Sequence, residues 1–133
     1  MASNNNSAAP GWLKFIPGII WFIFVLVVVF LPGDDVPDES WLSLSNFDKL
    51  IHATLFGGLV FFFCLPFKKA VIERTEKLNL FLRITIATIV WGFTTELIQK
   101  YFIPGRQYDL IDWIADSVGA IIAFFISRRL FAR

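Results

Sequence analysis

Four apolar stretches dominate the sequence, and each is long enough, or nearly so, to cross a lipid bilayer as a helix. A spanning helix needs about 20 mostly apolar residues, and the stretches cover Trp12–Leu31, Leu50–Phe67, Leu80–Phe102 and Leu110–Phe131. The composition agrees, because 56% of the residues are hydrophobic, whereas soluble domains have about 45–50% apolar residues. The sequence therefore predicts an all-α fold, an integral membrane bundle of four transmembrane helices.

The basic residues predict how this bundle is oriented in the membrane. Nine would lie on one side: Lys14, Lys68, Lys69, Arg74, Lys77, Arg83, Arg128, Arg129 and Arg133. Three would lie on the other side: Lys49, Lys100 and Arg106. Because the side richer in Lys and Arg is cytoplasmic, we expect both termini in the cytoplasm and the turn Pro104–Arg106 outside the cell.

The chain is organised as a short tail followed by one domain. Residues 1–11 are small and polar, which predicts a flexible N-terminal tail, and residues 12–133 form a single four-helix domain. The stretch Leu31–Asp35 lacks the small-x-small pattern of a cleavage site, so we expect an uncleaved span rather than a signal peptide. The net charge of +1 is too small to attract nucleic acid electrostatically.

Polar residues gather at the ends of the helices that this topology places outside. They are Asp48, Lys49 and His52 in the second segment, Glu96 and Gln99 in the third, Arg106 in the turn, and Asp109, Asp112 and Asp116 in the fourth. Three helices would bring these groups to one depth in the membrane. We therefore predict that they line a binding site.

Glu96 and Asp116 are the most informative of these residues, since each lies several residues inside an apolar run. An acid at the centre of a spanning helix opposes insertion by roughly 2.5–3.5 kcal/mol on insertion scales. Gly92, Gly119 and Ala123 share their helix faces at a spacing of three or four residues, and small residues at this spacing let membrane helices pack closely. We therefore expect both acids to face the interior of the bundle.

Some of the polar residues also have a purely structural interpretation. Asp48, Asp109 and Asp112 lie in or beside first helical turns, where acids cap free amides and interact favourably with the helix dipole. Lys49 fits a side chain that reaches along the membrane interface. In this interpretation Arg106 is a solvated turn residue, and His52 is a hydrogen-bonded histidine of the core.

Three kinds of chemistry fit this set of residues. Carboxylates with an imidazole can bind a divalent cation or transfer protons, and Arg106 with helix N-termini can hold a phosphate. No spacing matches a diagnostic metal motif such as H-E-x-x-H. The sequence therefore assigns no metal ligands and requires no cofactor, and the residue types leave all three kinds of chemistry open.

The order of these motifs resembles that of the VanZ-like family. The resemblance covers about Asp48 to Ala123 and rests on D-K-L-I-H, E-L-I-Q and P-G-R-Q-Y-D-L-I-D-W-I-A-D-S-V-G. The matching positions are Asp48, Lys49, His52, Glu96, Gln99, Arg106, Asp112, Asp116 and Gly119. The family often has Asn where this chain has Asp116, so the chain carries an extra carboxyl group there, and Asp109 matches a loosely polar position. The resemblance implies a bacterial envelope protein with a role in antibiotic resistance, such as resistance to teicoplanin.

Three functional classes stay open at this point. In the first, an outer-leaflet pocket in the bacterial cytoplasmic membrane recognises an envelope lipid head group or a glycopeptide-like molecule, with Arg106 on an anionic group. In the second, the protein is a membrane-embedded hydrolase or transferase that acts on a lipid head group, with Glu96 or Asp116 as general base and His52 as a second acid or base or as a metal ligand. The third class is an ion- or proton-coupled transporter, and a purely structural membrane protein is the remaining alternative. Membrane lipids are the expected partners, and the oligomeric state stays open.

Overall fold

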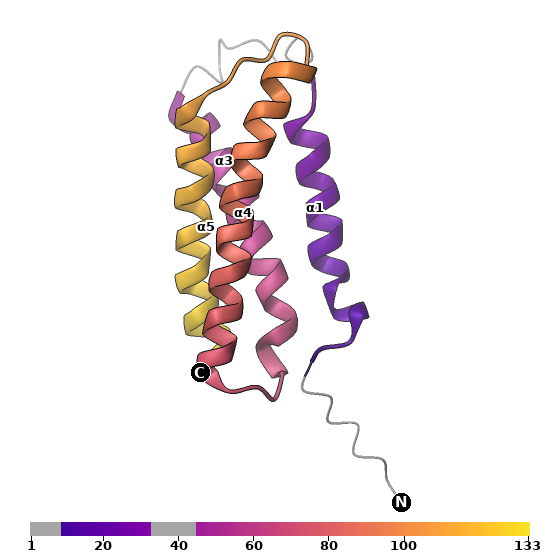
Figure 1. Ribbon diagram of the computed structural model, residues 1–133, viewed down its shortest axis with the longest axis vertical. Coiled ribbons are helices and arrows are strands. Elements are labelled where there is room, and N and C mark those ends of the chain that lie inside the picture. The colour runs from indigo at the N-terminus through magenta and orange to yellow at the C-terminus, as the bar shows by residue number, and fades with distance from the viewer. Residues whose placement is uncertain (1–8, 33–44) are drawn as a thin grey trace, which may run out of the picture.

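The computed structural model describes residues 9–32 and 45–133 and consists of long helices that run alongside one another (Figure 1). The elements are η1 (Trp12–Phe15), α1 (Ile16–Val29), α3 (Ser45–Cys64), η3 (Leu65–Lys69), α4 (Arg74–Phe102) and α5 (Leu110–Phe131). Four helices are long and apolar enough to cross a membrane. This confirms the predicted all-α fold with four candidate spans, while most of the predicted N-terminal tail lies outside the described residues.

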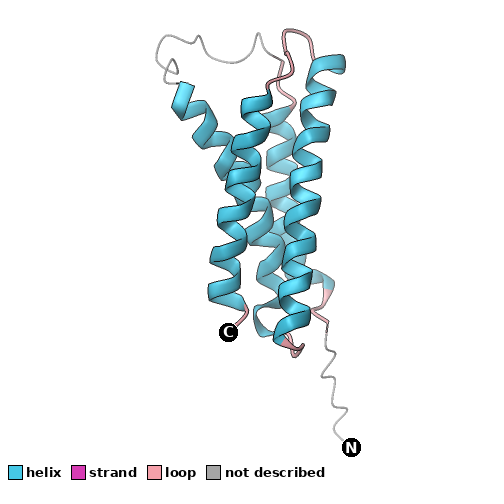
Figure 2. Cartoon of the chain, turned by 60° about the vertical axis from the view of Figure 1, so that its left-hand side comes forward, coloured by secondary structure: helices cyan, strands magenta, loops and turns pink. Residues whose placement is uncertain are grey.

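The described connections lie at the two ends of the bundle (Figure 2). The α4–α5 turn lies at one end, and the start of α1, the α3–α4 connection and the C-terminus lie at the other (Figure 1). Gly105 in the α4–α5 turn has φ of 75°, a conformation that glycine adopts without steric cost. The turn places the last residues of α4 beside the first residues of α5.

Helix α4 begins at Arg74, six residues before the apolar stretch that predicted it. The extra turns are held by contacts that the sequence pattern does not show. The Arg74 Nε donates to the Ala132 carbonyl oxygen at 3.0 Å, and the Lys77 Nζ donates to the Phe131 carbonyl oxygen at 3.3 Å. These bonds satisfy carbonyls at the C-terminal end of α5, where cationic side chains are favourable.

Helices α3 and α5 make the most extensive contact in the bundle. Their backbones touch at Gly119, where an added Cβ would lie 2.0 Å from the Ala53 carbonyl oxygen. Gly57, one turn further along α3, faces the Gly119 carbonyl oxygen in the same way, at 2.9 Å from an added Cβ. Small residues at this spacing on both helices let the two backbones approach closely.

Helix α1 packs against α3 through one hydrogen-bonded indole and through apolar contacts. Trp21 Nε1 donates to the Leu55 carbonyl oxygen at 2.9 Å, and the indole lies directly over Gly58, where an added Cβ would be 2.4 Å away. Val25 and Val29 of α1 are buried in the cluster around Phe56. The first span is therefore attached to the bundle along one face only.

The outer surface is apolar and much of the interior is polar. Ile20, Ile86, Val90 and Ile122 are all more than half exposed, as expected of helices that face acyl chains. The buried residues, by contrast, include many polar or charged side chains: His52, Lys77, Thr85, Thr88, Thr95, Glu96, Gln99, Asp116 and Ser127. This inverted distribution suits a multi-pass membrane protein, because a soluble fold would bury its large aliphatic side chains.

Candidate functional site

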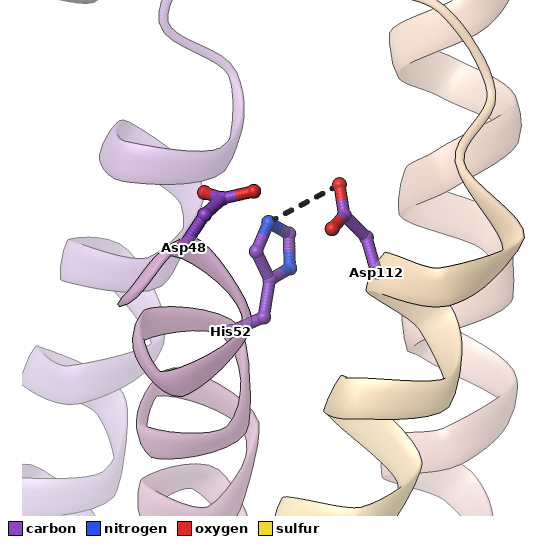
Figure 3. A group of neighbouring side chains, drawn as sticks. All are labelled: Asp48, His52 and Asp112. Atoms are coloured by element: carbon purple, nitrogen blue, oxygen red, sulfur yellow. Dashed lines mark ion pairs between the residues drawn. The ribbon is translucent and has the colours of Figure 1, made fainter. Parts of the chain in front are cut away.

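His52 lies at the centre of a polar cluster formed by α3, α4 and α5. Its Nδ1 lies 2.9 Å from Asp116 Oδ1, and its Nε2 lies 3.6 Å from Asp112 Oδ2. Figure 3 shows the imidazole between the α3 residue Asp48 and the α5 residue Asp112, with the ion pair to Asp112 drawn. Asp48 and His52 share one face of α3 because they are four residues apart. The imidazole therefore bridges two carboxyl groups of α5.

Lys49 lies three residues before His52 on α3, and it pairs with the more exposed acids, which form the rim of the cluster. Its Nζ contacts Asp112 Oδ1 directly, and it lies 3.2 Å from Asp109 Oδ2 and 3.7 Å from Asp48 Oδ2. The lysine is thus paired with three carboxylates, and it ties the start of α3 to the start of α5.

Asp109 has a structural role in addition to this ion pair, since it is the N-cap of α5. Its Oδ1 accepts a hydrogen bond from the Ile111 amide at 2.8 Å. Partial burial opposes the charged form of Asp109, but hydrogen bonds from Lys49 and the Ile111 amide outweigh this and lower the pKa of its carboxyl group. The cap and the ion pair together position the first turn of α5.

Glu96 and Asp116 form the floor of the cluster and are 1% and 0% exposed. Glu96 Oε2 accepts a hydrogen bond from the Asp109 amide at 3.1 Å. The second oxygens, Glu96 Oε1 and Asp116 Oδ2, are buried and have no hydrogen-bond partner among the described residues. Potential ligand atoms of His52, Glu96 and Asp116 lie within 4.8 Å of one another, although the three residues belong to three different helices.

Gln99 and Arg106 make their contacts with the end of α1. Gln99 Nε2 donates to the Val29 carbonyl oxygen at 2.7 Å, and Arg106 Nε donates to the Leu31 carbonyl oxygen at 3.3 Å. The last carbonyls of a helix lack intrahelical donors, and Gln99 supplies one to Val29, the last residue of α1. Arg106 supplies a donor to a carbonyl two residues beyond the helix. Within the described residues, neither side chain forms an ion pair or hydrogen bond with the His52 cluster.

Three residues that pack around the site or beside it were not predicted from the sequence in these roles. Gly92 was predicted as a packing residue, yet an added Cβ there would lie 3.2 Å from Asp116 Oδ2, so the glycine also leaves room beside that oxygen. Ala53 and Gly57 on α3 are the partners of Gly119. Their four-residue spacing, the small-xxx-small pattern of membrane helices, was a signal that could have identified them.

Comparisons with protein-family models, with curated proteins and with solved structures find no match to this chain. The fold and the site describe a protein with four helices long and apolar enough to cross a membrane, and with a buried carboxylate–histidine cluster toward one end of the bundle. The resemblance to the VanZ-like family stays a prediction from the motifs.

Proposed function

We propose that this chain is a multi-pass protein of the bacterial cytoplasmic membrane that binds the polar head of an envelope lipid or of a glycopeptide-like molecule. The observation that carries the proposal is a gradient of exposure along the carboxylates. The side chains of Asp48 and Asp109 are 54% and 44% exposed, Asp112 is 14% exposed and Asp116 is fully buried. The acids thus extend from the exposed rim of the cluster to its buried floor, and the exposed acids are accessible to a polar group.

The charges of the cluster suggest the chemistry of the head group. Five carboxyl groups share one lysine and one histidine. Lys49 is already paired with acids, and Arg106 donates to the Leu31 carbonyl oxygen. The carboxylates therefore favour an amine or hydroxyl group over a phosphate.

The distribution of basic residues and the motifs support the cellular location in this proposal. The end of the bundle opposite the cluster carries most of the Lys and Arg residues, which favours cytoplasmic termini and an extracytoplasmic cluster. The resemblance to the VanZ-like family supports an envelope role connected with antibiotic tolerance, including resistance to teicoplanin.

The first prediction concerns Asp112→Asn, which keeps the size of the side chain and removes its charge. We expect native mass spectrometry of gently purified protein to show lower occupancy by co-purified envelope lipids than in the wild type, because Asp112 lies between the exposed rim and the buried floor. Glu76→Gln is the matched control, since Glu76 lies in the first turn of α4 at the far end of the bundle. Equal lipid occupancy in all three proteins would contradict the proposal.

A hydrolase or transferase acting on a lipid head group is the second candidate, and the position of His52 favours it. The imidazole lies between Asp116 Oδ1 and Asp112 Oδ2, and a carboxylate that orients a histidine is typical of general bases. If this is the function, purified protein should turn over extracted envelope lipids with or without added Zn²⁺, Mg²⁺ or Mn²⁺. His52→Gln should then lower the rate by about 100-fold or more, whereas no turnover by the wild type would leave binding alone.

A further inference from the structure

The two most deeply buried carboxyl groups of the cluster are each left with one oxygen that the protein does not satisfy. Glu96 Oε1 and Asp116 Oδ2 have no hydrogen-bond partner among the described residues. Burying a carboxylate without a compensating partner costs several kcal/mol. Two acids with unsatisfied oxygens in the same buried cluster as one histidine favour a cationic ligand there.

The positions of the three residues suit a single small cation. Potential ligand atoms of His52, Glu96 and Asp116 lie within 4.8 Å of one another. Nitrogen and oxygen ligands about 2.0–2.2 Å from a tetrahedral ion lie about 3.4 Å apart, so small side-chain rotations bring all three residues into range. Each of the three residues comes from a different helix, so the packing of the bundle sets their positions relative to one another.

The second ring nitrogen of His52 strengthens this interpretation. Its Nε2 faces Asp112 Oδ2 at 3.6 Å, and Asp112 is itself held by Lys49. A histidine that binds a metal commonly donates its other N–H to a carboxylate, which sets the tautomer and the ring orientation. Asp112 is placed for that role, which leaves Nδ1 as the ligand atom.

The packing around Asp116 supports the same conclusion. An added Cβ at Gly92 would lie 3.2 Å from Asp116 Oδ2 and 3.3 Å from the ring of Phe56. Phe56 is fully buried. Glycine and an apolar ring therefore pack on this side of Asp116, and neither offers the unsatisfied oxygen a hydrogen bond.

We propose that His52, Glu96 and Asp116 bind one divalent transition-metal cation, Zn²⁺ or Mn²⁺, with Asp112 orienting the histidine. One imidazole and two carboxylates are ligands that suit these ions better than Mg²⁺ or Ca²⁺, which prefer oxygen alone. With three protein ligands, a fourth position stays open to water or to a ligand group. The metal site does not depend on the proposed head-group binding, and the two are tested by different measurements.

A second group, Asp48, His52 and Asp112, also has ligand atoms within 4.8 Å, but it is the weaker candidate. Asp48 is more than half exposed, and Asp112 is already paired with Lys49. Both groups share His52, so the ion occupies one position or the other. The effects of Asp48→Asn and Glu96→Gln distinguish them.

The test is metal binding by the full-length protein in detergent micelles, stripped with chelator and then dialysed against Zn²⁺ or Mn²⁺. We expect about one ion per chain for the wild type by elemental mass spectrometry. Glu96→Gln and Asp116→Asn should each weaken binding by more than about tenfold, a loss that even removal of an orienting carboxylate can produce. Asp48→Asn and Glu76→Gln should bind as the wild type does.

A second measurement distinguishes a loss of metal binding from a failure of the variant to fold. The wild type should gain thermal stability when the metal is added, because an ion that binds only the folded state stabilises it. Glu96→Gln that keeps the helical circular dichroism of the wild type should lose this gain. A wild type that binds neither ion, a folded Glu96→Gln that binds as the wild type does, or a loss of binding in Asp48→Asn alone would each overturn the proposal.

Discussion

Gly119→Ala is expected to destabilise the bundle by about 3 kcal/mol or more, the upper range for overpacked sites. The added methyl group would lie 2.0 Å from the Ala53 carbonyl oxygen and 2.6 Å from the Ala53 Cα. These are backbone atoms, so no side-chain rotation relieves the clash and α3 must move away from α5. Unfolding in mixed micelles of mild detergent and dodecyl sulfate, followed by tryptophan fluorescence, measures the loss.

Gly18→Ala is the matched control for this prediction. An added Cβ at Gly18 would make ordinary contact with the Phe63 ring at 3.4 Å, and Ala is favoured over Gly inside a helix by roughly 0.5–1 kcal/mol. Gly18→Ala should therefore leave stability unchanged or raise it slightly. If Gly119→Ala behaved as this control does, the close packing of α3 on α5 would be wrong.

His52→Leu is expected to cost about 3–5 kcal/mol, the range for breaking a buried pair by removing one partner. Asp116 is fully buried, and its Oδ1 has the His52 ring nitrogen at 2.9 Å. Without the imidazole both oxygens of Asp116 would be unsatisfied, since Oδ2 already lacks a partner among the described residues. The same unfolding assay, run with excess chelator, measures this effect in the absence of bound metal.

A double-mutant cycle separates the pair from other effects of the substitution. Adding Asp116→Asn to His52→Leu removes the buried charge that the first change leaves behind. We expect the double variant to be more stable than the sum of the single variants predicts, by about 1 kcal/mol or more. Strict additivity of the two single effects would show that His52 and Asp116 do not stabilise one another.

The four spans were predictable because their signal is local. A stretch of about 20 apolar residues identifies a spanning helix without any knowledge of its neighbours, and the fourth stretch, Leu110–Phe131, matches the observed helix α5 at both ends. The start of α4 at Arg74 was not predicted. Arg74 and Lys77 look like loop residues by hydropathy, whereas in the structure they belong to the helix and donate hydrogen bonds to the last carbonyls of α5.

The interior position of Glu96 and Asp116 was predictable from the sequence, because an acid inside an apolar run and small residues at helical spacing define one face of each helix. Which polar groups contact one another was not predictable in this way. Gln99 and Arg106 reach the end of α1, and Lys49 joins the acids of α5. Periodicity within a helix sets the face of a residue, whereas a contact of a few ångströms also depends on the rotation, shift and crossing of two helices, which only the packed bundle determines.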